Sequence, residues 1–396
     1  MRNYQLVYLI FSVLLLSSCQ ASSSLSDSQN ITVREDLFND QAFTTYIKTV
    51  IETEQQIFHL DDDIKRIVAE RIIPVKDPQK RAKKLLRQIF KNRSIGIVYS
   101  SSANLVASEA FHNNTANCLS LTIMAYALAK EANLNMRFQQ VDIPEYWVRN
   151  EQYNMLTGHV NLLLLTDKFA NTQVIYGRGN LQIDFDPYVS KKTFPSHLID
   201  KKRVVAMFYT NKGAQALVDN HYDIAYAYLK AAVVTDPSFS NGWGNLGLLY
   251  RLSNYKNLAE QTYLHALNLD AENNTVLSNY AYLLKMNGNF TQYENITRKL
   301  ENKRKHNPYY QALLADEANY QGDYKAAIQY YKKAIKLNSN IHEFYFELAK
   351  IYYRLNALNK AKKAMRKAIA LNHIPRTERQ YVAKLNFLKT VNQTYP

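Results

Sequence analysis

The fold is decided by residues 243–267, which read WGNLGLLYRLSNYKNLAEQTYLHAL. Small residues stand at Gly247, Ala259 and Ala266, at offsets that suit two consecutive helices. Two helices pack closely only where small side chains let their backbones approach each other. The stretch therefore predicts a helix pair that can stack on further copies of itself.

The same pattern recurs every 34 residues through the C-terminal half. Small residues occupy three offsets of the repeat: Gly213, Gly247, Ala281, Ala315 and Ala349, then Ala225, Ala259, Ala327 and Ala361, then Ala232, Ala266, Ala334 and Ala368. Repeat three departs from the pattern, with Tyr293 and Leu300 at its two alanine positions. The period and these residues resemble tetratricopeptide (TPR) repeats. The resemblance implies an all-α TPR solenoid of five repeats at 207–374, with a capping helix and tail at 375–396.

Asn211, Asn245 and Asn279 recur at the same spacing, on the first helix of each predicted pair. A ladder of amides can hydrogen-bond an extended peptide backbone, so these residues predict a groove that binds a protein or peptide partner. The alternative is that Asn is merely a common residue at that repeat position, and the spacing leaves both interpretations open. Basic residues on the second helices form either a solvated face or a contact for an anionic envelope partner. They are Lys332, Lys333, Lys336, Lys360, Lys362, Lys363, Arg366 and Lys367.

Residues 1–18 have the form of a lipoprotein signal peptide. The apolar stretch between Leu6 and Leu16 spans 11 residues, fewer than the roughly 20 that a membrane-spanning helix needs. The ending Leu-Ser-Ser-Cys resembles the lipobox of bacterial lipoproteins, which implies lipidation of Cys19. Gln20 after the cysteine then points to the outer membrane, facing the periplasm, and the Ser-rich residues 19–30 predict a flexible tether. An ordinary secretory signal with a chance cysteine is the alternative.

The net charge is concentrated in the repeats. Residues 201–396 hold 28 Lys or Arg against 14 Asp or Glu, whereas the first 200 residues hold 21 against 20. A basic region can indicate nucleic acid, a membrane surface or an acidic partner. Export of the chain argues against nucleic acid.

Cys118 is the second of two cysteines, and it has no intramolecular disulfide partner once Cys19 carries lipid. It follows the polar residues 113–117 and opens an apolar run without a helix breaker before Asn133. We therefore expect Cys118 in the first turn of a buried helix. The helix N-terminus favours the thiolate and so lowers the thiol pKa. Its unpaired N–H groups can also stabilise an oxyanion.

A cysteine nucleophile needs a base that a third group holds in place. His159 opens the apolar strand 160–164, and the alternating residues 181–186 predict a further strand that carries Asp184 and Asp186. A helix-start cysteine, a strand histidine and a carboxylate on the next strand form the papain-like arrangement. The two aspartates share one strand face, so either could reach the imidazole.

These segments resemble bacterial transglutaminase-like domains that precede TPR repeats, over roughly residues 60–195. The matching pieces include Asn117-Cys118-Leu119-Ser120, His159-Val160-Asn161 and Asp184-Phe185, whereas Ala116 stands where Gly often precedes the Asn-Cys pair. The resemblance implies an α+β transglutaminase-like (papain-like) domain at 31–206, with Cys118 as nucleophile and His159 as general base. It assigns the orientation of the imidazole to Asp184, with Asp186 as the alternative.

The expected protein is a lipid-anchored envelope protein that acts on amide bonds of a protein or peptide substrate by acyl transfer or hydrolysis. It needs no cofactor. A zinc site is disfavoured, because Cys118 has no second cysteine nearby and the chain offers no close histidine pair. The alternative is a non-catalytic TPR scaffold for envelope complexes.

Overall fold

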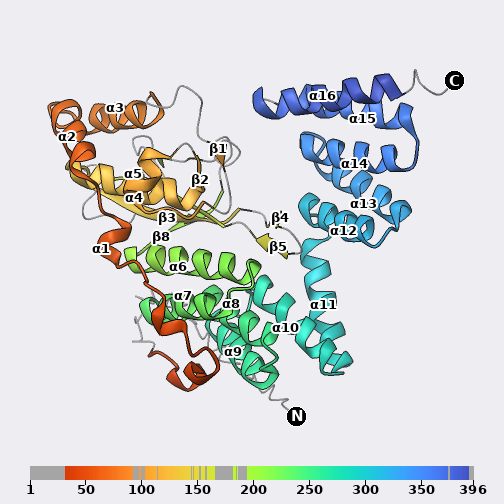
Figure 1. Cartoon of the computed structure of the whole chain (residues 1–396), viewed down its shortest axis with the longest axis horizontal. Helices are drawn as coiled ribbons and strands as arrows, with labels where there is room; N and C mark the ends of the chain where they lie inside the picture. Colours follow the sequence, from red (N-terminus) through yellow and green to blue (C-terminus); the bar gives the residue numbers. More distant parts are fainter. Residues whose placement is uncertain are drawn as a thin grey trace, which may run out of the picture. The chain divides into compact units, whose positions relative to one another are not determined.

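The computed structural model describes residues 32–91, 98–99, 103–113, 115–143, 145, 147–150, 153–156, 158–165, 182–183, 185, 194–372 and 375–391 (Figure 1). The predicted signal peptide, the tether and the lipidation site Cys19 lie outside these residues. Within the described ranges, every helix is too short or too polar to cross a membrane.

The N-terminal region mixes helices with short strands. Its helices are η1 (Glu35–Leu37), η2 (Asp40–Ala42), η3 (Tyr46–Lys48), α1 (Glu54–Ile57), α2 (Asp62–Arg71), α3 (Pro78–Lys91), α4 (Ala107–His112) and α5 (Cys118–Glu131). Its strands are β1 (Val98–Tyr99), β2 (Thr115–Ala116), β3 (Met136–Val141), β4 (Trp147–Asn150), β5 (Tyr153–Leu156), β6 (His159–Leu164), β7 (Gln182–Ile183) and β8 (Ser196–Ile199).

In the C-terminal region, all regular secondary structure of the described residues is helical. Its helices are α6 (Lys201–Val218), α7 (Tyr222–Thr235), α8 (Ser240–Leu252), α9 (Lys256–Leu269), α10 (Asn274–Met286), α11 (Phe290–Arg304), α12 (Pro308–Tyr320), α13 (Tyr324–Leu337), α14 (His342–Arg354), α15 (Leu358–Leu371) and α16 (Pro375–Val391). Helices α6–α15 therefore form five consecutive pairs, and α16 follows the last pair.

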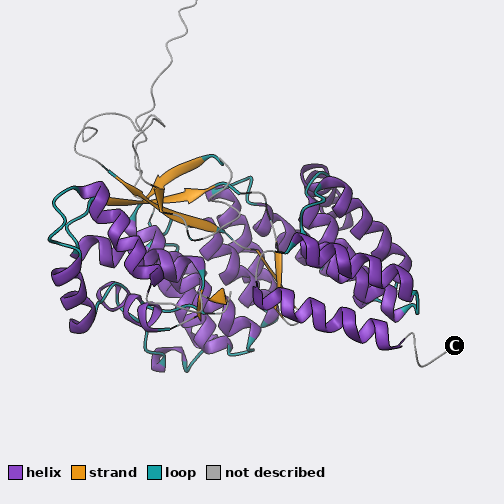
Figure 2. Ribbon diagram, turned by 90° about the horizontal axis from the view of Figure 1, so that it is seen from above, coloured by secondary structure: helices purple, strands orange, loops and turns teal. Residues whose placement is uncertain are grey.

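The N-terminal region contains a four-stranded antiparallel sheet, whose strands are orange in Figure 2. The strand order is β7-β6-β3-β8, and β3 pairs with β6 from Val141 opposite His159 to Met136 opposite Leu164. Helix α5 packs on one face of this sheet, where the Tyr126 ring stacks on Phe138 with 4.3 Å between centroids. The described residues also form two smaller sheets, the parallel pair β1-β2 and the antiparallel hairpin β4-β5.

A residue with left-handed backbone ends the first helix of every pair. These residues are Asn220, Asn254, Gly288, Gly322 and Asn356, with φ between 56° and 82°, and they stand 34 positions apart. Gly and Asn tolerate this conformation best, and it is the usual way to end a helix and reverse the chain. The reversal therefore falls at the same place in each repeat.

The first helix pair shares an apolar core with the N-terminal region. Val204 and Phe208 of α6 and Tyr228 of α7 belong to the cluster that also contains α5, β3 and β6 residues. Helix α6 runs unbroken across position 206, where the sequence places the domain boundary. The repeats and the sheet are thus packed together and not joined by a linker.

The arm at residues 33–48 lies on the first two helix pairs of the array, where it contacts α7 and α9. Leu37 and Phe43 are fully or almost fully buried there, with exposed fractions of 0% and 3%. The Phe43 ring stacks on Tyr226 at 4.6 Å, and the Tyr250 hydroxyl donates to the Leu37 carbonyl at 2.7 Å. The arm is therefore a part of the array's packing.

We predict that Gly247→Ala destabilises the array. A Cβ atom at position 247 would lie 2.8 Å from the ring of the fully buried Tyr263. Such overpacking costs about 1–3 kcal/mol, against about 1 kcal/mol that alanine gains over glycine inside a helix. The urea midpoint, followed by circular dichroism, should fall. Gly242→Ala is the control, because its closest contact is 3.1 Å from Val233 and its loss should be smaller. Equal stability of Gly247→Ala and the parent would contradict this packing argument.

Candidate functional site

Asn117 builds the start of α5. Its side-chain oxygen accepts a hydrogen bond from the Ser120 amide at 2.8 Å, as expected of an asparagine N-cap. Its Nδ2 donates to Asn104 Oδ1 at 2.6 Å. The Ser120 hydroxyl accepts from the Leu105 amide and donates to the Ala103 carbonyl. The segment around Asn104 is therefore fastened to the first turn of the helix by buried polar groups.

Cys118 is the first residue of α5, as the sequence predicts, and it is a buried thiol with 8% of its surface exposed. The Thr122 hydroxyl lies 2.8 Å from the Cys118 carbonyl oxygen and 3.0 Å from the Val160 carbonyl oxygen. Val160 follows His159 in β6. The structure therefore brings the start of α5 and the start of β6 together.

His159 is the first residue of β6 and is 2% exposed. Val160, Leu162 and Leu164 belong to the core that β6 shares with α5. Because side chains alternate along a strand, His159 and Asn161 lie on the opposite face. Asp184 and Asp186, the two candidates for the third position, lie outside the described residues.

Gln139 is a buried polar residue of this region that sequence reasoning missed. It pairs with Asn161 across the sheet, two positions from the Val141–His159 pair, and is 3% exposed. Its Oε1 has no hydrogen-bond partner among the described residues. Its strand, Met136–Val141, also holds Arg137 and Gln140, so the sequence alone does not single out Gln139. Among the described residues, no group of three His, Cys, Asp or Glu side chains could hold a metal ion.

The predicted amide ladder lies on α6, α8 and α10. Asn211, Asn245 and Asn279 are all half-buried. Within the described part of the chain, none of their side-chain amides makes a hydrogen bond. This face therefore offers donors and acceptors to a ligand.

The basic residues predicted on the second helices lie on α13 and α15. Every one of them is exposed except Lys362, which is half-buried. Neither α13 nor α15 contains an acidic residue. Their positive charge therefore faces solvent without a carboxylate on the same helix.

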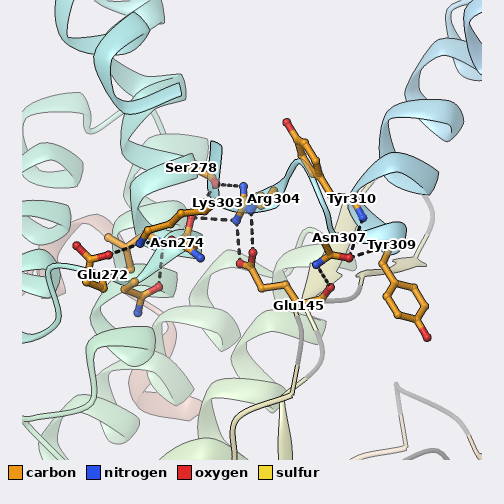
Figure 3. Close-up of polar contacts among 11 residues, drawn as sticks. Glu145, Glu272, Asn274, Ser278, Lys303, Arg304, Asn307, Tyr309 and Tyr310 are labelled. Carbon is orange, nitrogen blue, oxygen red and sulfur yellow. Dashed lines mark hydrogen bonds and ion pairs between the residues drawn. The ribbon is translucent and has the colours of Figure 1, made fainter. Parts of the chain in front are cut away.

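A buried ion pair joins the N-terminal region to the junction between α11 and α12 (Figure 3). Arg304, the last residue of α11, donates from Nε and Nη2 to the two Glu145 carboxylate oxygens at 2.8 and 2.9 Å. Asn307 Nδ2 donates to the Glu145 carbonyl at 2.6 Å, while Asn307 Oδ1 caps α12. We call Glu145, Arg304 and Asn307 the clamp. Sequence reasoning missed it because 159 positions separate the two charges.

Arg304 also ties the clamp to α10. Its Nη1 donates to the Ser278 hydroxyl at 2.9 Å, and its Nη2 to the Asn274 carbonyl at 3.3 Å. Ser278 directly precedes Asn279 of the amide ladder. The clamp therefore lies next to the face that the ladder occupies.

Comparisons with known proteins match the C-terminal region. A family model described as tetratricopeptide repeat matches residues 240–273 and 342–372, and another described as TPR repeat matches residues 315–356. The chain's C-terminal region thus contains TPR repeats, and that prediction is confirmed. The transglutaminase-like resemblance of the N-terminal region stays a prediction. A search of the curated proteins finds no match.

Several solved structures are similar to this chain. The structure described as "Functional Characterization of Pseudomonas Aeruginosa pilF" is 18% identical, covers 50% of this chain and 95% of its own, and has a TM-score of 0.29. YrrB, described as a TPR protein with an unusual peptide-binding site, is 14% identical over 45% of this chain and 92% of its own, with a TM-score of 0.26. A MamA protein is 17% identical over 42% and 91%, also with a TM-score of 0.26.

We predict that Asn117→Ala loosens the start of α5. Loss of an N-cap costs about 0.5–2 kcal/mol, and Asn104 Oδ1 also loses its buried donor. Hydrogen exchange at the Ser120 amide should accelerate, and the melting temperature should fall. Asn289→Ala is the matched control, because Asn289 is an exposed N-cap whose bond to the Gln292 amide is 3.4 Å long. An effect of Asn289→Ala as large as that of Asn117→Ala would refute the role of the buried network.

Proposed function

We propose that this chain is a lipid-anchored protein of the bacterial cell envelope, in which a TPR array holds a protein or peptide partner for a cysteine-dependent acyl-transfer domain. The observation that carries the proposal is the capped helix start: Cys118 opens α5, and Thr122 fastens that turn to the strand of His159. The anchor is the lipidated Cys19. An array and a thiol site packed into one body suit a protein that acts on the partner it binds.

The array's part is recognition. Three half-buried amides at one repeat position can pair with an extended backbone, which asks for alternating donors and acceptors. The exposed basic residues of α13 and α15 supply a second contact, for an anionic partner of the envelope. An acidic protein partner would use both faces.

The chemical step is nucleophilic acyl transfer. The Cys118 thiolate attacks an amide carbonyl, and backbone N–H groups at the start of α5 stabilise the oxyanion. The amine leaves with a proton from the His159 imidazolium as the C–N bond breaks, and water or an amine then cleaves the thioester. Since His159 and Val160 point to opposite faces of β6, this proton transfer requires the imidazole to reach the thiol around the end of the strand. An aspartate at 184 or 186 orients the ring.

We predict that an acyl-amide probe labels Cys118 in a His159-dependent manner. Loss of a general base lowers such rates by about 10²–10⁴-fold, so His159→Ala should abolish labelling and Cys118→Ser should remove the labelled site. His197→Ala is the matched control, because His197 is an exposed histidine of the same sheet. Separate Asp184→Asn and Asp186→Asn variants should identify the orienting carboxylate by which one loses labelling.

An inert thiol in the folded chain would reject the enzyme. That outcome favours the alternative function, a non-catalytic TPR scaffold for envelope complexes. The burial of both Cys118 and His159 is the specific observation on its side, because a substrate has to displace what covers them.

The proposed binding of a peptide to the amide ladder can be tested separately from the chemistry. Peptides selected from a display library on the full chain should bind less well to Asn245→Ala and Asn279→Ala. Each lost hydrogen bond is worth about 0.5–1.5 kcal/mol, which corresponds to a several-fold rise in Kd by titration calorimetry. Asn257→Ala, an exposed asparagine on the second helix α9, should leave the Kd unchanged. Equal binding by all variants would rule out the amide ladder.

A further inference from the structure

The array lacks a continuous apolar core at the junction of α11 and α12. One apolar cluster reaches Tyr293 and Ile296 of α11, and another begins with Tyr309 and Ala312 of α12. No cluster of the described residues combines the two helices. The two large residues at small positions of repeat three, Tyr293 and Leu300, lie on α11. The apolar clusters of the described residues therefore do not span this junction.

Polar contacts connect the two sides of this junction. Arg304 is 7% exposed and Glu145 is half-buried, so their ion pair is shielded from solvent. The Glu145 side chain holds the end of α11, and its backbone carbonyl holds the residue that caps α12. One residue of the N-terminal region thus bridges both sides of the break (Figure 3). Strand β4 packs against α12 in the same place.

Glu145 is close in sequence to the thiol site. It follows β3, whose last residue Val141 pairs with His159, and it precedes the hairpin β4-β5 that leads into β6. Glu145 is therefore connected along the chain to both strands of the Val141–His159 pair. The start of α5 is connected to β6 in turn, by the hydrogen bond from Thr122 to Val160.

We propose that the clamp residues Arg304 and Asn307 are positioning residues for the Cys118 and His159 site, and that the clamp transmits the angle between α11 and α12 to that site. A partner on the amide ladder lies beside Ser278, so it biases Arg304 directly. The linkage is reciprocal: a ligand at the thiol site changes partner affinity by the same factor. This inference rests on the proposed function of the two sites.

The test measures alkylation of Cys118 by iodoacetamide, with intact mass as the readout. The full chain carries Cys19→Ser, so that Cys118 is its one thiol. Arg304→Met and Glu145→Gln break the ion pair, and we expect each to change the alkylation rate by about fivefold or more, the usual size of such coupling. Arg304→Lys keeps the positive charge but cannot bind both carboxylate oxygens as the guanidinium does, so its alkylation rate should lie between the rates of the parent and of Arg304→Met.

Two controls separate linkage from lost stability. Lys303→Met removes the neighbouring cation, which pairs with Glu272 of the array and not with the N-terminal region, and should leave the rate within about twofold. Gly247→Ala destabilises repeat two without touching the clamp. Should Gly247→Ala change the rate as much as Arg304→Met, the effect is general unfolding and the inference is wrong.

The remaining outcomes also decide the matter. If Arg304→Met fails to fold, Glu145→Gln gives the answer, because an amide keeps a hydrogen-bond acceptor at that position. A folded Glu145→Gln that alkylates at the parent rate overturns the inference. Iodoacetamide reports access to the thiol whether or not the site is catalytic. If the acyl-amide probe fails to label Cys118 but the alkylation rate still depends on the clamp, the enzyme function is rejected and the linkage is supported.

Discussion

Helix α6 buries its two halves in two different cores, and the relation between the sheet and the repeats depends on it. Val204, Val205 and Phe208 pack with α5 and the sheet, while Ala216 and Leu217 pack with the arm and the second repeat. Burial of each large apolar side chain contributes about 1.5–3 kcal/mol to stability. Separating either half of α6 from its core would therefore lower the free energy of unfolding by at least that amount. The first repeat is therefore fixed against the N-terminal region with its sheet. The positions of the later repeats depend on other contacts.

At the α11–α12 junction, where the apolar clusters end, the ion pair between Arg304 and Glu145 holds the end of α11. Buried ion pairs contribute little net stability, because desolvation offsets most of the attraction. Their advantage here is geometric. The guanidinium fork of Arg304 meets both oxygens of Glu145 and so fixes a direction as well as a distance. Apolar side chains at the same place could bind as tightly, but they would accept a range of angles between the helices.

The sequence predicts those parts of the structure that are encoded locally. The repeats follow from small residues 34 positions apart, and the start of α5 follows from Asn117 before an apolar run. The left-handed turns also have a local signal, because Asn or Gly stands at the same repeat position each time, at Asn220, Asn254, Gly288, Gly322 and Asn356. The arm and the clamp could not be predicted, because Leu37 and Glu145 find their partners 213 and 159 positions away. Nothing in the neighbouring residues marks such contacts.

The buried polar residues on the far face of β3 and β6 bear on the choice between enzyme and scaffold. Gln139 keeps a side-chain oxygen without a hydrogen-bond partner at 3% exposure, beside Asn161 and two positions from the His159 pair. An unpaired buried polar group costs about 1–3 kcal/mol. A scaffold would be more stable with an apolar residue there, as at Phe138 and Leu162 on the other face. Natural sequences depart from such local consistency mainly where function requires it, and under the proposed function Gln139 lies at the end of the sheet where the chemistry takes place.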